Sequence, residues 1–314
     1  MAEFWRGVTK IWRSAAMTLV WRRVRESCRK QRRPWPLLDA SDVTRYRAPV
    51  RILGLLNSNA RGGDARIAAE DLFPNRMRGP LSQALGEPVE ITARIAWPTP
   101  RLPRVAAQWM AESRPDLVVF PISSFWFLYE SVPVRLERKL GPIGGAVAAA
   151  SLRAAATPWL AHNGAFQTLR RTAQRTVGGS AYFEPGQVIE VATATIHSLL
   201  RDENPYLLVI GPSGGDQWAT DSASAARIAA KRRSVDDSMG ALCRSLHVEY
   251  WGASDIAAIR DPRKASLQGD RLHLDAEGHR RTAEHYLDPI TALCRRAKAH
   301  AADEGSSPAP APVA

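Results

Sequence analysis

Residues 50–60 of the 314-residue chain read VRILGLLNSNA. The first seven, Val50–Leu56, form an apolar run with the length of a buried strand, and a polar turn follows directly. Four further short apolar runs are predicted as strands: Val89–Ala96, Asp116–Ile122, Tyr206–Ile210 and His247–Trp251. Segments with helical character lie at 64–85, 102–112, 187–202, 222–246 and 276–297. Strands that alternate with helices predict a mostly parallel sheet covered on both faces, which is a three-layer α/β/α sandwich.

The polar turn after the first predicted strand contains Ser58. In parallel α/β sheets, ligands bind outside the carboxyl ends of the strands. A serine at that place is positioned as a nucleophile, and its own backbone N–H can stabilise an oxyanion. The alternative interpretation is an ordinary turn serine, which is common beside Asn and Gly.

A second polar segment, GDRLHLDAEGH at residues 269–279, leads into the last predicted helix. Asp270 and His273 are three residues apart, ahead of a helix start predicted at Asp275. A carboxylate that accepts a hydrogen bond from an imidazole selects its tautomer, and the pair can act as a general base. The alternative is a capping aspartate beside a surface histidine.

The segment DRLHLDAEGHRRTAEHYL, residues 270–287, closely resembles the last motif of the SGNH (GDSL-type) hydrolase superfamily, including its Gly-His pair at Gly278-His279. In that family a serine follows the first strand within Gly-Asp-Ser, and Leu56-Asn57-Ser58 stands at that place here. The stretches Leu72–Met77 and Pro115–Val119 also fit the layout of the family.

This resemblance spans roughly residues 50–297 and implies a flavodoxin-like SGNH hydrolase fold. It implies Ser58 as the nucleophile, His273 as the base and Asp270 as the acid that orients the base. The implied activity is cleavage of an ester through an acyl-enzyme on Ser58, as in an acylesterase or lipase. The alternatives are acyl transfer to a sugar or polyol hydroxyl and a non-catalytic descendant of the fold that binds a ligand.

Two motifs depart from the family pattern. The second motif lacks its glycine, since Ala93–Trp97 reads ARIAW, and the third has Phe125 where the family has an asparagine oxyanion donor. Loss of such a donor typically costs about 10²–10³ in rate. The residues predicted to bind the oxyanion or the substrate are therefore Asn57, Arg94, Ser123 and Ser124.

Aromatic residues follow the second and third predicted strands, and the loop after the fourth is rich in glycine. Trp97, Phe125, Trp126 and Phe127 could line an entrance for an acyl chain or belong to the core. The loop Gly211–Asp216 could line the same site or bind an anion through backbone N–H groups.

The net charge of +12 is concentrated in the first 33 residues. That segment has ten Lys and Arg against two Glu, a charge of +8, which leaves +4 for the other 281 residues. Its apolar residues recur at helical spacing, with Trp5, Ile11 and Leu19 among them. A basic amphipathic helix is typical of an anionic membrane surface, although packing onto the domain explains it as well. Because the rest of the chain is near neutral, nucleic acid is not a predicted partner.

The predicted organisation is a basic arm (1–36), a linker (37–48), a hydrolase-like domain (49–298) with a lid-like insertion (128–186), and a disordered tail (299–314). The arm is too short to span a bilayer and lacks the cleavage site of a signal peptide. The predicted location is cytoplasmic, with peripheral attachment to the inner face of the membrane. The predicted partner is a small-molecule, lipid or glycan ester.

Cofactors and metals are not predicted from these residues. The three cysteines lie far apart without Cys-x-x-Cys spacing, which argues against a disulfide scaffold and a cysteine zinc site. The histidines lack metal-ligand spacing. A Gly-x-Gly-x-x-Gly motif and a Walker loop are both missing from the sequence, which argues against nicotinamide and nucleotide phosphate binding.

Overall fold

The computed structural model describes residues 48–61, 67–132, 179–201, 205–219, 221–259 and 273–305, with a few isolated residues between these ranges (134, 135, 137–139, 141, 168, 172 and 267). All of these described residues belong to one compact unit. The predicted basic arm, nearly all of the predicted linker and most of the predicted lid lie outside the described residues. Asp270 also lies outside them.

The described strands form one parallel sheet in the order β2-β1-β3-β4-β5. The strands are β1 (Val50–Leu56), β2 (Val89–Ile95), β3 (Leu117–Pro121), β4 (Tyr206–Ile210) and β5 (Glu249–Trp251). This strand order is that of flavodoxin-like doubly wound folds. It confirms the predicted fold class, which is also the class that the SGNH resemblance implies.

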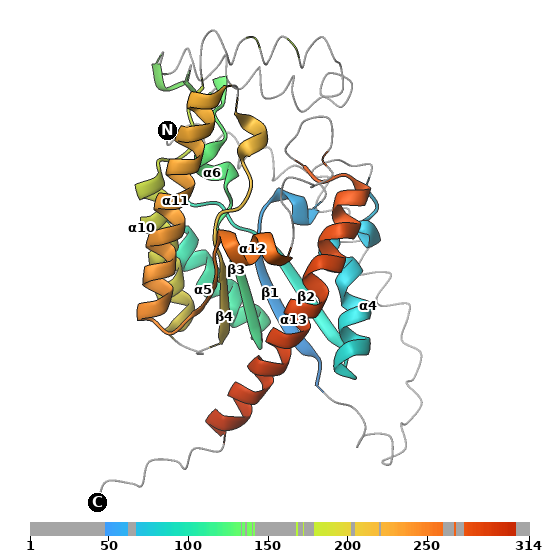
Figure 1. The fold of residues 1–314 in the computed structure, drawn as a ribbon. Helices are drawn as coiled ribbons and strands as arrows, with labels where there is room; N and C mark the ends of the chain where they lie inside the picture. Colours follow the sequence, from blue (N-terminus) through green and yellow to red (C-terminus); the bar gives the residue numbers. More distant parts are fainter. Residues whose placement is uncertain are drawn as a thin grey trace, which may run out of the picture. The chain divides into compact units, whose positions relative to one another are not determined.

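Helices cover both faces of the sheet (Figure 1). They are α4 (Phe73–Leu85), α5 (Leu102–Ser113), α6 (Phe125–Leu128), α10 (Pro185–Leu200), α11 (Ser222–Ser245), α12 (Ala253–Ile259) and α13 (Ala276–Gly305). On one face α10 packs against α5 and α11, and on the other α13 packs against α4. The predicted three layers are therefore present.

Successive side chains of each strand point to opposite faces of the sheet, so each face has its own hydrophobic core. In β1, Leu53 and Leu55 belong to the cluster that includes α5, α10 and α11, whereas Val50 and Ile52 belong to the cluster that includes α4 and α13. A strand covered on both faces reads as a nearly continuous apolar run, and in β1 only Arg51 interrupts it. For that reason the run at 50–56 was recognisable as a central strand.

Two predicted helix boundaries were wrong by more than two residues. The helix predicted over 64–85 begins only at Phe73, because Pro74 favours the first turn of a helix, and a short 3₁₀ helix, Ala69–Asp71, precedes it. The last helix continues to Gly305, into the segment predicted as a tail, because Ala-rich sequence favours the helix as far as that glycine. Helices α6 and α12 were not predicted, since each spans only one or two turns.

The two ends of the predicted lid-like insertion lie side by side. The backbone N–H of Ser131 donates to the carbonyl of Ser180 at 2.9 Å, and the reverse bond measures 3.1 Å. Within the part of the chain that the structure describes, no helix has the length and apolar character needed to cross a membrane.

Candidate active site

Ser58 lies immediately beyond the carboxyl end of β1, as the first residue of a 3₁₀ helix, Ser58–Arg61. Asn57 begins this turn: its side-chain oxygen accepts a hydrogen bond from the N–H of Asn59 at 3.1 Å, and its carbonyl accepts from Ala60 at 3.0 Å. An asparagine side chain in this role replaces a backbone hydrogen bond and tightens the turn. Ser58 is held at the surface by this turn, with its side chain exposed.

His273 approaches the same point from the other end of the chain. The Oγ atom of Ser58 lies 3.1 Å from the Nε2 atom of His273, across 215 residues of sequence. In the tautomer with its proton on Nδ1, Nε2 accepts a hydrogen bond from the serine hydroxyl. The structure thus brings together the two residues that the sequence singles out as nucleophile and base.

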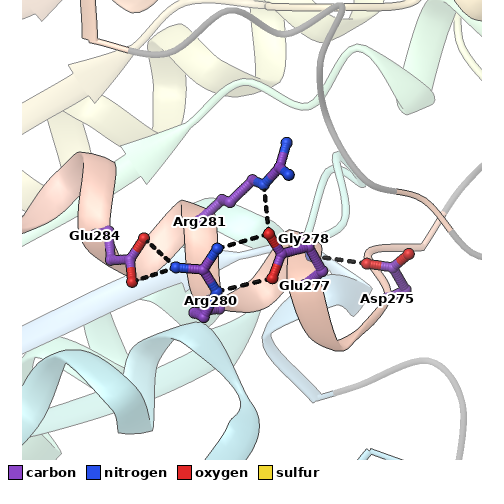
Figure 2. Close-up of polar contacts among 6 residues, drawn as sticks. All are labelled: Asp275, Glu277, Gly278, Arg280, Arg281 and Glu284. Atoms are coloured by element: carbon purple, nitrogen blue, oxygen red, sulfur yellow. Dashed lines mark hydrogen bonds and ion pairs between the residues drawn. The ribbon is translucent and has the colours of Figure 1, made fainter.

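Asp275 marks the start of α13, two residues after His273. Its carboxylate accepts a hydrogen bond from the N–H of Gly278 at 2.7 Å (Figure 2). Its backbone carbonyl accepts a second one from the N–H of His279 at 2.9 Å. This is the geometry of a helix cap. The predicted helix start is therefore confirmed, and it places His273 just before a rigid element.

The first turns of α13 carry an exposed network of charges (Figure 2). The carboxylate of Glu277 pairs with Arg280 at 2.6 Å and Arg281 at 2.7 Å, and Arg280 also pairs with Glu284 at 2.6 Å. Hydrogen bonds from Arg280 and then Arg281 lower the pKa of Glu277 to about 2. Such exposed pairs stabilise the helix only weakly.

A cavity of about 350 Å³ opens beside Ser58 and His273. Its mouth lies at the carboxyl ends of β1 and β3. From β1 the chain continues to β2, which pairs with one edge of β1, and the next strand, β3, pairs with the other edge. That reversal in strand order is the topological switch point, where ligands bind in folds of this class. The volume lies in the range of sites for small molecules.

Three of the four predicted oxyanion or substrate residues line this cavity: Asn57, Ser123 and Ser124. The hydroxyl proton of Ser124 is already used in another contact, since the hydroxyl donates a hydrogen bond to the carbonyl of Ser213 at 2.7 Å. This bond ties the loop after β3 to the glycine-rich loop after β4. Four residues of the latter loop line the cavity, as one of the two interpretations predicts: Gly211, Ser213, Gly214 and Gly215.

Arg94 is the exception, and its placement in the site was wrong. Ile91 and Ile95 of β2 line the cavity, so the intervening Arg94 points to the opposite face of the sheet. There its Nη2 atom pairs with Glu112 of α5 at 3.3 Å. The sequence alone does not reveal which face of a strand meets a cavity.

Trp97, Phe125 and Trp126 line the cavity, as one of the two interpretations predicts, and Trp126 is at the same time buried in the core. Trp97 is 37 % exposed, and its ring lies 5.4 Å from Tyr182 and 5.6 Å from Phe183 between centroids. Phe127 does not line the cavity and is fully buried in the core, as the other interpretation predicts.

Two contacts that hold the site together were not predicted. The side-chain oxygen of Asn59 accepts a hydrogen bond from the N–H of Leu274 at 2.9 Å. The Nδ1 atom of the fully buried His279 accepts from the N–H of Phe73 at 3.3 Å, and burial lowers the pKa of this histidine. Each contact joins segments more than 200 residues apart, and no local pattern signals such a pairing.

Within the described residues, no group of three or more His, Cys, Asp or Glu side chains is arranged to hold a metal ion.

Comparison with known proteins yields structural matches. A scan against protein-family models and a search of curated proteins find no match to this chain. Among solved structures, the chain is similar to TesA, with a TM-score of 0.46 and 12% identity over 77% of this chain and 99% of that one.

Two further matches have similar extents. Est24, a carbohydrate acetylesterase from Sinorhizobium meliloti, has a TM-score of 0.44 and 14% identity over 77% of this chain and 99% of that one. The lipase/acylhydrolase from Enterococcus faecalis has a TM-score of 0.44 and 11% identity over 77% of this chain and 95% of that one. Likeness at this level concerns the fold, and it leaves the activity of this chain to its own residues.

Proposed function

We propose that this protein is a serine hydrolase that cleaves an ester through an acyl-enzyme on Ser58. The observation that carries the proposal is the distance of 3.1 Å between Ser58 Oγ and His273 Nε2, at the mouth of a cavity lined mainly by apolar side chains. A serine hydroxyl is a weak nucleophile unless an adjacent base takes its proton. The imidazole of His273 lies within hydrogen-bond reach for that step.

The reaction follows from these two groups. Ser58 Oγ attacks the ester carbonyl carbon while its proton passes to His273 Nε2. The tetrahedral intermediate collapses, the bond to the alkoxy oxygen breaks, and the imidazolium protonates the departing alcohol. Water then attacks the acyl-enzyme with His273 again as base, which releases the acid and restores the serine. The sequence resemblance assigns to Asp270 the role of orienting His273.

The oxyanion that forms during attack requires donors close to Ser58. The backbone N–H of Ser58 opens a 3₁₀ helix, where such groups lack partners within the helix. The amide nitrogen of Asn57 and the hydroxyl of Ser123 are the other donors proposed here, because both residues line the cavity. Together they would replace the family asparagine, whose place Phe125 occupies.

An activity-based probe tests the proposal. A fluorophosphonate should label the wild type, and Ser58→Ala and His273→Ala should both lose labelling while retaining their melting temperatures. Ser245→Ala, which changes an exposed serine on α11, serves as the matched control and should label normally. A folded wild-type protein that resists labelling would favour the non-catalytic, ligand-binding alternative.

Hydrolysis and acyl transfer share the acyl-enzyme and differ only in the acceptor. Turnover of an ester in the presence of glycerol distinguishes them, since transfer yields an acylglycerol in place of the free acid. Exclusion of water from a closed site favours transfer.

The predicted basic arm, residues 1–36, is the basis for a proposal about where the protein acts in the cell. We propose a cytoplasmic protein whose residues 1–36 attach to anionic lipid. Co-sedimentation with anionic vesicles, weakened by salt and missing with neutral vesicles, is the expected result. Equal binding of a chain lacking residues 1–36 would contradict it.

A further inference from the structure

The cavity beside Ser58 continues beneath the catalytic residues, between the sheet and the pair of helices α4 and α13. In this part, the strand residues that line the cavity occupy alternate positions: Ile52, Gly54 and Leu56 of β1, Ile91 and Ile95 of β2, Val119 and Pro121 of β3, and Ile210 of β4. Alternate residues of a strand share one face. All of these side chains therefore face α4 and α13, and these two helices form the opposite wall of the cavity.

Residual exposure on this face shows that the space is open. Val119 is 8% exposed and Ile210 is 7% exposed, although both belong to central strands covered by helices. On the opposite face of the same strand, Val118 and Phe120 are both 0% exposed. A close-packed core leaves few voids larger than a water molecule, so the surface left on Val119 and Ile210 belongs to the cavity.

Gly54 forms part of the floor of the cavity. It lies in the middle of β1, opposite Ala93 of β2 and Val119 of β3. A Cβ atom at this position would lie 2.9 Å from Cγ of Leu56, so a larger side chain would have to displace Leu56 or fill the cavity. Glycine weakens a strand interior and often marks a close approach by a ligand.

The helical wall is mainly apolar. Met77 and Leu81 of α4 and Ile290 of α13 line the cavity, and Thr282 and Tyr286 of α13 add two hydroxyl groups to this wall. From Leu56 next to the catalytic turn to Ile52 is four residues along β1, a depth of about 13 Å at roughly 3.3 Å per residue. With carbon–carbon bonds of about 1.5 Å in a zigzag, this depth corresponds to about ten chain carbons.

We propose that this part of the cavity binds the acyl chain of the substrate, and that the enzyme prefers esters of acids with roughly eight to twelve carbons over acetate esters. The inference rests on the proposed function, because a hydrocarbon bound here is the acyl chain of a substrate only if Ser58 at the mouth attacks its ester carbonyl. Apolar walls without a charged side chain favour a hydrocarbon over a sugar. Each methylene group that enters should strengthen binding about fourfold, until the cavity is filled.

The experiment separates binding from catalysis. In a Ser58→Ala background, decanoate below its critical micelle concentration should raise the melting temperature, whereas acetate should not. Val119→Phe places a ring in the cavity and should abolish the effect of decanoate. Should this variant misfold, Val119→Ile is the milder version, and Val118→Ile is its matched control on the opposite face of β3.

In the active protein, p-nitrophenyl decanoate should be hydrolysed with at least a tenfold higher kcat/KM than p-nitrophenyl acetate. Val119→Phe should reverse this preference, and Val118→Ile should keep it. A higher kcat/KM for acetate in the wild type, or stabilisation by decanoate that survives in Val119→Phe, would overturn the inference while the probe labelling of Ser58 still stood. Stabilisation by decanoate without labelling would sustain the apolar site and overturn the proposed function instead.

Discussion

Asn59 and Leu274 join the two loops that carry Ser58 and His273, the proposed catalytic pair: the side-chain oxygen of Asn59 accepts a hydrogen bond of 2.9 Å from the backbone N–H of Leu274. Asn59 follows Ser58 and Leu274 follows His273. The hydrogen bond therefore lies one residue beyond each of them and fixes the proposed nucleophile and base relative to each other. Leu274 is itself buried, which anchors the loop of His273 on the core.

Removal of this hydrogen bond should reduce turnover more than stability. Asn59→Ala should lower kcat roughly tenfold with little change in KM, because a small misplacement of reacting groups carries a large cost in rate. Asn59→Asp retains the acceptor and should recover most of kcat. Steady-state kinetics with a p-nitrophenyl ester measure both effects. An equal loss of kcat in the two variants would argue against positioning by this bond.

Ser123 and Ser124 should respond differently to the same substitution. Ser123→Ala should lower kcat about 10²-fold at an unchanged melting temperature, since it removes a proposed oxyanion donor. Ser124→Ala removes the hydrogen bond to the carbonyl of Ser213 and should cost about 1 kcal/mol of stability, with a smaller effect on kcat. Kinetics and thermal unfolding of the two variants, measured together, test this division. Full activity in Ser123→Ala would exclude its hydroxyl from the oxyanion hole.

Trp97 at the mouth of the cavity should contribute to substrate binding. Trp97→Ala should raise KM for esters several-fold, because the ring is partly exposed and contacts Tyr182 and Phe183. Loss of about 1 kcal/mol of ring contacts should lower the melting temperature by roughly 2–4 °C. Trp109→Ala on α5 is the control: its side chain packs against the core, so it should lose stability without a change in KM.

His279 should make the fold sensitive to mild acid. Burial lowers its pKa below the value of about 6.5 in the unfolded chain, with Arg76 and His273 acting in the same direction and Asp275 and Asp71 opposing it. The unfolded state therefore binds more protons below about pH 6.5. Stability from this group is present above that pH and is lost as the pH falls, by at most about 1.4 kcal/mol per pH unit.

The comparison with His279→Asn isolates this effect. Asparagine keeps an acceptor for the N–H of Phe73 but does not titrate. Urea unfolding between pH 8 and pH 5 should show the wild type losing stability relative to His279→Asn as the pH falls. Parallel curves for the two proteins would show that His279 does not account for the acid sensitivity.

The sequence by itself determined the strands and singled out Ser58 and His273 as the proposed nucleophile and base. Val50–Leu56 was predicted with its observed bounds, since a strand buried on both faces is a nearly continuous apolar run, which only Arg51 interrupts here. Ser58 and His273 were identified because they stand at a strand's carboxyl end and in a recognisable motif. Both features depend on residues that are close together in the sequence, so they can be recognised from the sequence alone.

Only the tertiary structure decided which of the remaining residues meet. Arg94 lies on the face of the sheet away from the site, and nothing in its neighbours reveals that face. The bond between Asn59 and Leu274 spans 215 residues, and the apolar cavity exists because α4 and α13 cross the sheet without filling the space above Gly54. Contacts and voids of this kind arise from the packing of distant segments, so no stretch of sequence specifies them alone.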